Sequence, residues 1–249
     1  MKSKSMENYV CIGCGAPSNV LHKTFQGGFI ELVKCASCNK FVDRYTEFDN
    51  VLIILDLLLF KPEAFRHVLL NRENSIDGRL ITLYLLSETY MKWNRMHFSK
   101  FDMNTDSFKW NAVTESQFYW LLLLSSLEML VNYAMAAFLI LFYASWRANA
   151  KSFNVSSFYT FKTQTDSVGV LKRFVQAIVL SSYGKLFMIA AAIWAHNEPI
   201  LSLSLIQMFV LASNIQALKV ITNVNSRQAL LLLGIPMIVS KFISFMLSF

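Results

Sequence analysis

The amino-acid sequence predicts a small N-terminal zinc-ribbon-like β module followed by an all-α membrane domain with four to five membrane segments. Two observations predict this fold class. All four cysteines lie in two close pairs within the first 38 residues, and the chain is very apolar, with 55% hydrophobic and only 16% charged residues. Soluble domains usually carry about 25% charged residues. We expect three parts: the module over 1–50, an interfacial helical segment over 51–115 and transmembrane helices over 116–249.

The two cysteine pairs share the spacing C-x2-C and are separated by a longer intervening stretch. Two intervening residues allow both thiolates of a pair to approach one tetrahedral ion, and Zn²⁺ binds such thiolates at about 2.3 Å. Turn-forming residues accompany each pair, with Gly15 and Pro17 after the first and Asn39 after the second,. We therefore predict one structural zinc ion held by Cys11, Cys14, Cys35 and Cys38.

Two disulfides or a redox C-x-x-C motif are the alternatives to zinc. The N-terminal sequence lacks the apolar core of a cleaved signal peptide, so we expect this end of the chain in the cytosol, where thiols stay reduced. No strand–helix pattern of the thioredoxin type follows either pair. Because four thiolates fill a structural zinc site, we expect the metal to hold the fold rather than catalyse, and we expect His22 at the surface.

The segment between the cysteine pairs is predicted to form a β-hairpin. The stretches KTF (23–25) and FIELVK (29–34) alternate in polarity on either side of the Gly27–Gly28 dipeptide. Two such runs around a short glycine-containing turn are typical of a hairpin. A zinc ribbon requires a hairpin of this kind.

After the module, residues 51–60 form an apolar run in which Asp56 is the one polar residue. Ten residues cannot cross a hydrocarbon layer of about 30 Å. Pro62 then predicts the first turn of a second helix, and we expect His67 to be structural or interfacial. Two interpretations stay open for this segment: a helix lying in the membrane interface, or a buried helix packed on the ribbon.

Four apolar stretches in the second half are long enough to span a membrane, because about 20 helical residues suffice. Aromatic residues near their ends, such as Tyr119, Trp146 and Trp194, suit the membrane–water interface,. Much of the net charge of +7 comes from basic residues scattered between these stretches, which indicates membrane flanks and no nucleic-acid partner,. The predicted spans are 116–146, 174–195, 200–218 and 229–249.

The distribution of basic residues conflicts with a cytosolic zinc module. The loop 147–173 and a shorter later loop are rich in Lys and Arg, so both should be cytosolic,. A single crossing by 116–146 would then place the module in the lumen. Either residues 80–93 enter the membrane as a fifth, imperfect element, which we favour, or 116–146 folds back as a hairpin around Glu128. Glycosylation of the Asn-Val-Ser sequon at 154–156 would place loop 147–173 in the lumen and overturn this orientation.

Three charged residues fall inside the apolar stretches, namely Glu128, Lys185 and Lys241. Each costs at least about 2.5–3.5 kcal/mol near the middle of a membrane, so such residues normally face the helix bundle or a polar cavity. Glu128 shares a helix face with Asn132, four residues later. We hypothesise that Glu128 pairs with Lys185 and that Glu128, Asn132 and Lys185 line a polar groove for a lipid headgroup. The alternatives are a structural ion pair or a lysine that snorkels to the interface, and we expect Lys241 to snorkel.

The sequence carries no recognised catalytic motif, because it lacks G-x-S-x-G, H-E-x-x-H, a P-loop and G-x-G-x-x-G,. His196 and Glu198 lie beside Pro199 and would suit an intramembrane transferase. A polar turn at the membrane surface is the simpler interpretation. We therefore expect a protein that is not an enzyme and that has no catalytic or cofactor-binding residues apart from the zinc ligands.

Several motifs together resemble the Arv family of endoplasmic-reticulum (ER) membrane proteins. They are the two cysteine pairs with their spacing, the acidic turn VDRYTEFD (42–49), the apolar run around Asp56 and the stretch RHVLLN (66–71). The stretches SSYGKLF (181–187) and LASNIQALKVIT (211–222) are also similar to the family. Jointly these motifs are specific, whereas the paired cysteines alone would not be.

The resemblance implies a zinc-binding N-terminal domain on a multi-span protein of the ER membrane, with the Golgi as a further location. It implies a role in sterol and sphingolipid homeostasis and in the synthesis of glycosylphosphatidylinositol (GPI) anchors. The implied partners are membrane lipids (sterol, sphingolipid and GPI precursors) and membrane enzymes of GPI biosynthesis. We expect a protein that binds, moves or presents lipid. The alternative is an accessory scaffold subunit of a GPI-anchor or other lipid-modifying complex, and the third interpretation is an undescribed membrane lipid transferase.

Overall fold

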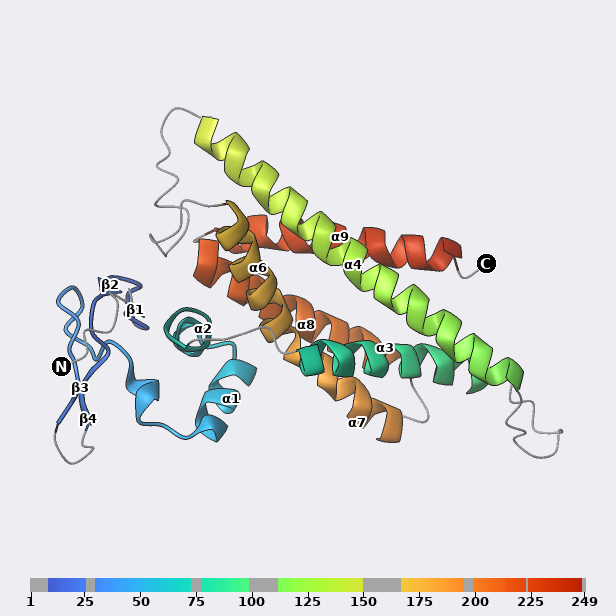
Figure 1. Ribbon diagram of the computed structural model, residues 1–249, viewed down its shortest axis with the longest axis horizontal. Helices are drawn as coiled ribbons and strands as arrows, with labels where there is room; N and C mark the ends of the chain where they lie inside the picture. Colours follow the sequence, from blue (N-terminus) through green and yellow to red (C-terminus); the bar gives the residue numbers. More distant parts are fainter. Residues whose placement is uncertain are drawn as a thin grey trace. The chain divides into compact units, whose positions relative to one another are not determined.

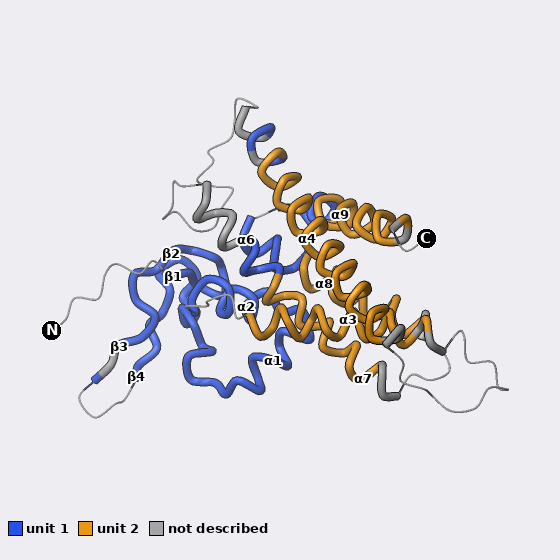
Figure 2. Tube along the Cα trace, turned by 45° about the vertical axis from the view of Figure 1, so that its right-hand side comes forward, with its two compact units in different colours: residues 1–75, 143–178, 215–229 blue, residues 76–142, 179–214, 230–249 orange. Residues whose placement is uncertain are grey.

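The computed structural model describes residues 9–25, 30–72, 78–98, 112–149, 167–194, 199–222 and 224–247. The chain forms two compact units that alternate along the sequence (Figure 2). The domain limits expected at residues 50 and 115 remain a prediction. Unit 1 comprises residues 1–75, 143–178 and 215–229, and unit 2 comprises residues 76–142, 179–214 and 230–249.

The N-terminal part of unit 1 contains two very short antiparallel sheets (Figure 1). β1 (Tyr9–Val10) pairs with β2 (Pro17–Ser18), and β3 (His22–Thr24) pairs with β4 (Ile30–Leu32). The second pairing confirms the predicted hairpin, whose Gly27–Gly28 turn lies outside the described residues. Strands of two or three residues are too short to be stable alone. Other contacts must therefore hold this module together.

Four short helical elements follow the sheets in unit 1. The second α-helix begins with Pro62 at its first position, as predicted, because the missing proline N–H would have no intrahelical partner there,. The last element is a π-turn, closed by the N–H of Arg72 donating to the carbonyl of His67,. The elements are η1 (Arg44–Thr46), α1 (Asn50–Leu58), α2 (Pro62–Arg66) and η2 (His67–Asn71).

Helix α1 has two different apolar faces. Ile53 is buried and joins Ile12, Tyr45 and Ala64 in a small core, so this face packs on the cysteine module. Much of the remaining surface of the helix and its C-terminal end is apolar and exposed. The packing on the ribbon is therefore confirmed for one face, and a position of the open face in the membrane interface stays a prediction. The exposed apolar residues are Val51, Leu52, Ile54, Leu55 and Leu59.

Longer helices form most of the remaining chain and confirm the predicted fold class. They are α3 (Gly78–Phe98), α4 (Ala112–Asn149), α6 (Ser167–Ser181), α7 (Phe187–Trp194), α8 (Pro199–Thr222) and α9 (Ser226–Leu247). Among the described residues, four segments are long and apolar enough to cross a membrane, and each overlaps a predicted span. They are Glu115–Tyr143, Phe174–Ala191, Leu201–Thr222 and Ser226–Ser244.

The hairpin alternative for residues 116–146 is wrong. These residues lie within α4, a single helix of 38 residues, because no glycine or proline interrupts the apolar sequence there,. Residues 80–93 lie in α3, which is helical but is not among the four segments apolar enough to span. Their entry into the membrane stays a prediction. The sequon at 154–156, most of the basic loop and the turn containing His196 lie outside the described residues.

The second candidate span is interrupted by the 3₁₀ turn η3 (Ser182–Leu186), which separates α6 from α7. Its Gly184 packs directly on α8, where an added Cβ would lie 2.6 Å from the ring of Phe209. The hydroxyls of Ser181 and Ser182 both donate to the side-chain oxygen of Asn214. The two family-like stretches in the membrane half therefore meet in space.

Candidate metal centre and buried charge cluster

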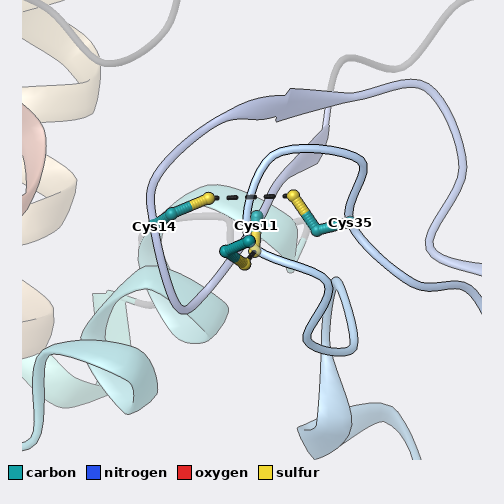
Figure 3. A group of neighbouring side chains, drawn as sticks. Cys11, Cys14 and Cys35 are labelled. Atoms are coloured by element: carbon teal, nitrogen blue, oxygen red, sulfur yellow. Dashed lines mark hydrogen bonds between the residues drawn. The ribbon is translucent and has the colours of Figure 1, made fainter.

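The four cysteine thiols converge at one point, although they come from two segments of unit 1. Their sulfur atoms all lie within 4.8 Å of one another. Cys14 Sγ is 3.7 Å from Cys35 Sγ (Figure 3). Cys11 Sγ is 3.7 Å from Cys38 Sγ, so each short contact joins one pair to the other. His22 lies in β3 and is not a member of this group.

The two C-x2-C segments form matching turns. The N–H of Gly15 donates to the carbonyl of Cys11, and the N–H of Asn39 donates to the carbonyl of Cys35, both at 2.9 Å. Gly15 has φ 81° and Asn39 has φ 58°. Glycine and asparagine adopt this left-handed conformation at the lowest cost. The predicted turn residues therefore close the two turns that bring the thiols together.

Backbone donors and burial shift the thiol pKa values in opposite directions. The N–H groups of Cys38 and Ser37 donate to the Cys35 sulfur and lower the pKa of Cys35 to about 6. Burial raises the pKa of Cys11 to about 12 and also raises that of Cys14. A cation at the centre would favour all four thiolates, because a metal replaces the thiol protons.

The sulfur arrangement fits a tetrahedral zinc ion. Four Zn–S bonds of about 2.3 Å imply sulfur–sulfur distances of about 3.8 Å, and two of the observed distances are 3.7 Å,. The donor set of four thiolates matches structural zinc, which has no open coordination position. The four predicted residues thus come together in a group that could hold a metal ion.

A buried polar network attaches this centre to the helices that follow it. The guanidinium of Arg66 in α2 donates to the carbonyls of Ile12 and Gly13, at 2.7 and 2.8 Å, and so holds the first cysteine turn. In η2, the side chain of Asn71 exchanges two hydrogen bonds with the backbone of Val10, both at 2.9 Å. These contacts explain why the module and α2 form one unit.

Asp43 is fully buried at the centre of this network. Its carboxylate accepts from the N–H of Tyr45, from the side-chain amide of Asn71 at 2.7 Å, and lies 2.8 Å from Nδ1 of His67. The π-turn places His67 and Asn71 on the same carboxylate. His67 is therefore structural, as one of the two sequence interpretations had it.

A second buried carboxylate, Asp56 of α1, accepts from the hydroxyl of Tyr45 and from the ammonium of Lys61, each at 2.7 Å. These donors lower the pKa of Asp56, with the Lys61 hydrogen bond as the largest cause. Burial, followed by the bond to Asp56, raises the pKa of Tyr45 to about 12. Asp56 thus ties the apolar helix α1 to the acidic turn.

Five charged side chains gather in unit 2, two of them on α3 and three on candidate membrane spans. Glu128 of α4 lies 2.6 Å from the ammonium of Lys92 and 2.5 Å from that of Lys241. Glu88 of α3 lies 3.1 Å from Lys185 and 3.1 Å from Lys241, and 3.8 Å from Lys92. We call these five residues the charge cluster.

The charge cluster corrects two sequence-based predictions. The direct partner of Lys185 is Glu88 and not Glu128, although both glutamates belong to the same cluster. Lys241 does not snorkel to the interface, because it bridges the two glutamates. Asn132 is half-buried one helical turn after Glu128.

Sequence reasoning missed Glu88 and Lys92 as site residues, because they stood out only as interruptions of an apolar segment. Their i,i+4 spacing on one helix face is the signal that could have identified them,. It also missed Asp43 and Asn71, which look like ordinary polar loop residues in the sequence. Both lie in stretches that resemble the Arv family, VDRYTEFD (42–49) and RHVLLN (66–71), and this is the signal that could have identified them.

Comparison with known proteins shows similarity over nearly the whole chain. The family model described as the Arv1-like family matches residues 10–218. Protein ARV1 of Mus musculus is 35% identical over 95% of this chain and 82% of its own length, and Protein ARV1 of Homo sapiens is 34% identical over 90% and 76%. The Protein arv1 homolog of Dictyostelium discoideum is 29% identical over 89% and 87%. No solved structure matches the chain.

Proposed function

The chain belongs to the Arv1-like family, and on that basis we propose that it is an ER membrane protein of lipid homeostasis. Its proposed role is to bind, move or present lipid, with sterol and sphingolipid distribution and the supply of GPI-anchor precursors as its targets. We propose that it does so without catalysing a reaction. The Golgi membrane is a further proposed location.

The observation that supports lipid handling most strongly is the charge cluster within otherwise apolar helices. Glu128, Lys185 and Lys241 lie on candidate membrane spans, and their partners Glu88 and Lys92 lie on α3. A lipid has a polar head and apolar tails, so it requires a polar site bordered by an apolar surface. Charges inside membrane segments usually mark substrate pathways or binding sites.

The position of α3 supports its proposed role as a fifth membrane element. Met91 of α3 packs with Met188 of α7 and Leu203 of α8 in one buried group of unit 2. Glu88 of the same helix reaches Lys185 and Lys241 on two candidate spans. Five membrane elements would reconcile the basic loops with a cytosolic cysteine module.

We propose zinc as the ion of the four-thiolate centre. When bound, it would cross-link the two cysteine turns and stabilise the small sheets, since a closed four-thiolate site is structural. Arg66, Asp43 and Asn71 would then transmit that rigidity to α2 and η2. The exposed apolar residues of α1 would lie in the membrane interface beneath the module,.

Reconstitution of the purified full-length protein tests the proposal. Donor and acceptor liposomes, with labelled GPI precursor or labelled sterol in the donor, should exchange label faster with the protein than without it. The double variant Glu128→Gln, Lys185→Met should lose most of the acceleration, whereas Lys219→Met, a lysine outside the charge cluster, should retain it. Label exchange at the protein-free rate for every lipid would contradict a lipid mover.

Two other functions make different predictions in the same preparation. A scaffold subunit would co-purify with a stoichiometric membrane enzyme of GPI or other lipid modification, and that enzyme's activity would fall without this chain. A lipid transferase would convert a lipid into a new chemical species in the absence of other proteins. The dense buried network around Asp43 gives the cysteine module a rigid surface, which suits docking to a partner and keeps the scaffold as the second candidate.

A further inference from the structure

The charge cluster is not neutral. It contains three lysines and two glutamates, and all five side chains belong to unit 2. Within the described part of unit 2, the one other carboxylate is that of Glu115, which lies about 20 Å along α4 from Glu128,. One ammonium charge is therefore in excess inside a group of apolar helices. An uncompensated charge in such surroundings is strongly unfavourable, so an anion is the expected complement.

The exposure of the five side chains shows which sign of charge an incoming group would meet. The side chains of Lys241 and Lys92 are 37% and 23% exposed, whereas those of Lys185, Glu88 and Glu128 are 15%, 11% and 5% exposed. Lys92 and Lys241 thus form the accessible side of the cluster, and the two carboxylates are more deeply buried. A cation or a neutral amine would find its acceptors covered.

The local backbone around Lys185 favours a binding site over a simple ion pair. Lys185 lies on η3, the 3₁₀ interruption of a candidate span. Broken helices of this kind commonly form the binding sites of membrane transport proteins. The buried hydroxyl of Tyr133, which interacts electrostatically with Lys185, has no hydrogen-bond partner among the described residues and is available as a further donor.

From these observations we propose that the charge cluster binds one phosphate group, as the monoester or diester of a phospholipid headgroup, through Lys92, Lys185 and Lys241. A phosphate brings the negative charge that the cluster lacks and several acceptor oxygens for lysine ammonium groups. Glu88 and Glu128 hold the three ammonium groups apart and in place. The inference rests on the proposed lipid-handling function and specifies the chemical class of lipid.

Native mass spectrometry of the detergent-purified full-length protein tests this site. The protein is titrated with phosphatidic acid, with phosphatidylcholine and with inorganic phosphate, in separate experiments. We expect phosphatidic acid to bind at least about tenfold more tightly than phosphatidylcholine, because a phosphatidylcholine headgroup carries its own compensating cation. In Lys241→Gln, the preference should fall by about tenfold or more, since removal of one partner of a buried charge pair has at least that effect.

Three further variants separate anion recognition from a purely structural role. Lys241→Arg should keep the preference because it keeps the charge, and Lys219→Gln should keep it because that lysine is outside the cluster. Lys92→Gln provides a second loss of charge should Lys241→Gln fail to fold. A structural ion-pair cluster predicts instead that Lys→Gln variants change thermal stability and leave the headgroup preference unchanged, which would overturn the proposal.

The three titrations also separate this inference from the proposed function. Equal binding of phosphatidic acid and phosphatidylcholine by the unmodified protein would overturn the phosphate site and leave lipid handling intact. Binding of neither lipid would overturn the phosphate site, while the exchange of labelled sterol or GPI precursor between liposomes would still decide the proposed function. Competition by millimolar inorganic phosphate would indicate that the phosphate group itself is recognised, whereas a lack of competition together with the lysine-dependent preference would assign the site to the intact lipid headgroup.

Discussion

The two units treat buried charge in different ways. In unit 1, each buried carboxylate is saturated by donors, as Asp43 is by Tyr45, His67 and Asn71. In unit 2, three ammonium groups surround two carboxylates and one positive charge is left over. A saturated network can only stabilise the fold, whereas an unbalanced cluster is suited to bind a ligand of the opposite charge.

The two networks also differ in how far apart along the chain their members lie. Asp43 is 24 residues from His67 and 28 from Asn71, and the longest-range bond of this network joins Asn71 to Val10, 61 residues away. Glu88 is 97 residues from Lys185 and 153 from Lys241. Unit 1 can therefore depend on a local metal centre, while the charge cluster requires the helices of unit 2 to be assembled first.

The largest expected effect comes from removing two thiols of the metal centre. In the double variant Cys35→Ser, Cys38→Ser, the zinc content of the purified protein should fall from one ion to none. Zinc binding supplies about 10–16 kcal/mol in zinc-finger peptides, and strands of two or three residues are too short to be stable alone. Residues 9–72 should become protease-sensitive, and the abundance of the protein in cells should fall. Limited proteolysis and elemental analysis measure both.

His22→Ala is the matched control for this prediction, because His22 lies near the cysteines in sequence and outside the thiol group. It should keep one zinc ion and native protease resistance. The comparison between the units would break if the double cysteine variant kept the resistance of residues 9–72, because unit 1 would then be held by its polar network alone.

The next largest effect is expected from Glu88→Gln. This change removes the carboxylate that faces all three lysines and raises the excess from one positive charge to two. Loss of one partner from a buried charge pair costs about 3–5 kcal/mol, so the thermal unfolding midpoint in detergent should fall markedly. Added phosphatidic acid should stabilise Glu88→Gln more than the unmodified protein, because the excess positive charge of the cluster is larger in the variant.

Glu115→Gln is the control for that effect, because Glu115 is exposed at the start of α4. It should change stability by no more than about 0.5 kcal/mol. An equally small effect of Glu88→Gln would mean that the cluster is solvated rather than buried, and the contrast with Asp43 would disappear.

The separation of the paired residues along the chain explains what could be predicted from the sequence. Each C-x2-C pair, the hairpin and the start of α2 at Pro62 depend on residues close together in the sequence, and local spacing identifies them. The partners of Lys185 depend on helix packing across about a hundred residues, so the sequence indicated that the charge needed a partner without indicating which one,.

The network around Asp43 illustrates a different limit of sequence reasoning. Asp43, His67 and Asn71 are common loop and helix residues, and their burial follows from the π-turn that aligns the last two. A π-turn has no strong sequence signature, because the hydrogen bonds shift by one residue without a special residue type. The hairpin alternative for residues 116–146 was wrong for a related reason. It rested on the length of the apolar stretch, and length alone does not show that the chain turns.

A smaller effect is expected from Gly184→Ala, which tests whether the 3₁₀ turn must lie close to α8. The new Cβ would lie 2.6 Å from the Phe209 ring and 3.0 Å from a methyl group of Val210. The ring cannot move freely, because Tyr183 and Phe187 pack edge-on against it. We expect a loss of about 1–3 kcal/mol, the usual range for overpacking, and a weaker preference for phosphatidic acid because Lys185 would be displaced.

Gly234→Ala in α9 is the matched control, since an added Cβ there has nothing within 4 Å. It should be neutral or stabilise the helix by up to about 1 kcal/mol, because alanine favours helix more than glycine. If both glycine variants behaved alike, the close contact between η3 and α8 would not constrain Lys185.

The smallest effect is expected in unit 1, from Lys61→Gln. The ammonium of Lys61 and the hydroxyl of Tyr45 lower the pKa of Asp56 in the folded protein. Asp56 therefore contributes stability that is present above its unfolded pKa, which is about 3.9, and that is lost as the pH falls through the folded pKa. Lys61 is 43% exposed, so solvent screens the pair, and its loss should cost only about 0.2–1 kcal/mol at neutral pH,.

The pH dependence makes even this small effect measurable. In Lys61→Gln, the folded pKa of Asp56 rises, so acid should destabilise the cysteine module at a higher pH than in the unmodified protein. The protease resistance of residues 9–72 is measured at a series of pH values from 7 to 3. It should be lower in Lys61→Gln than in the unmodified protein at neutral pH, and the two proteins should become equal at the acid end. Lys34→Gln, an exposed lysine of the same module, should follow the unmodified protein throughout. A constant offset across the whole pH range would show that Lys61 acts through packing alone, and the buried carboxylates of unit 1 would then owe their stability to neutral donors rather than to charge.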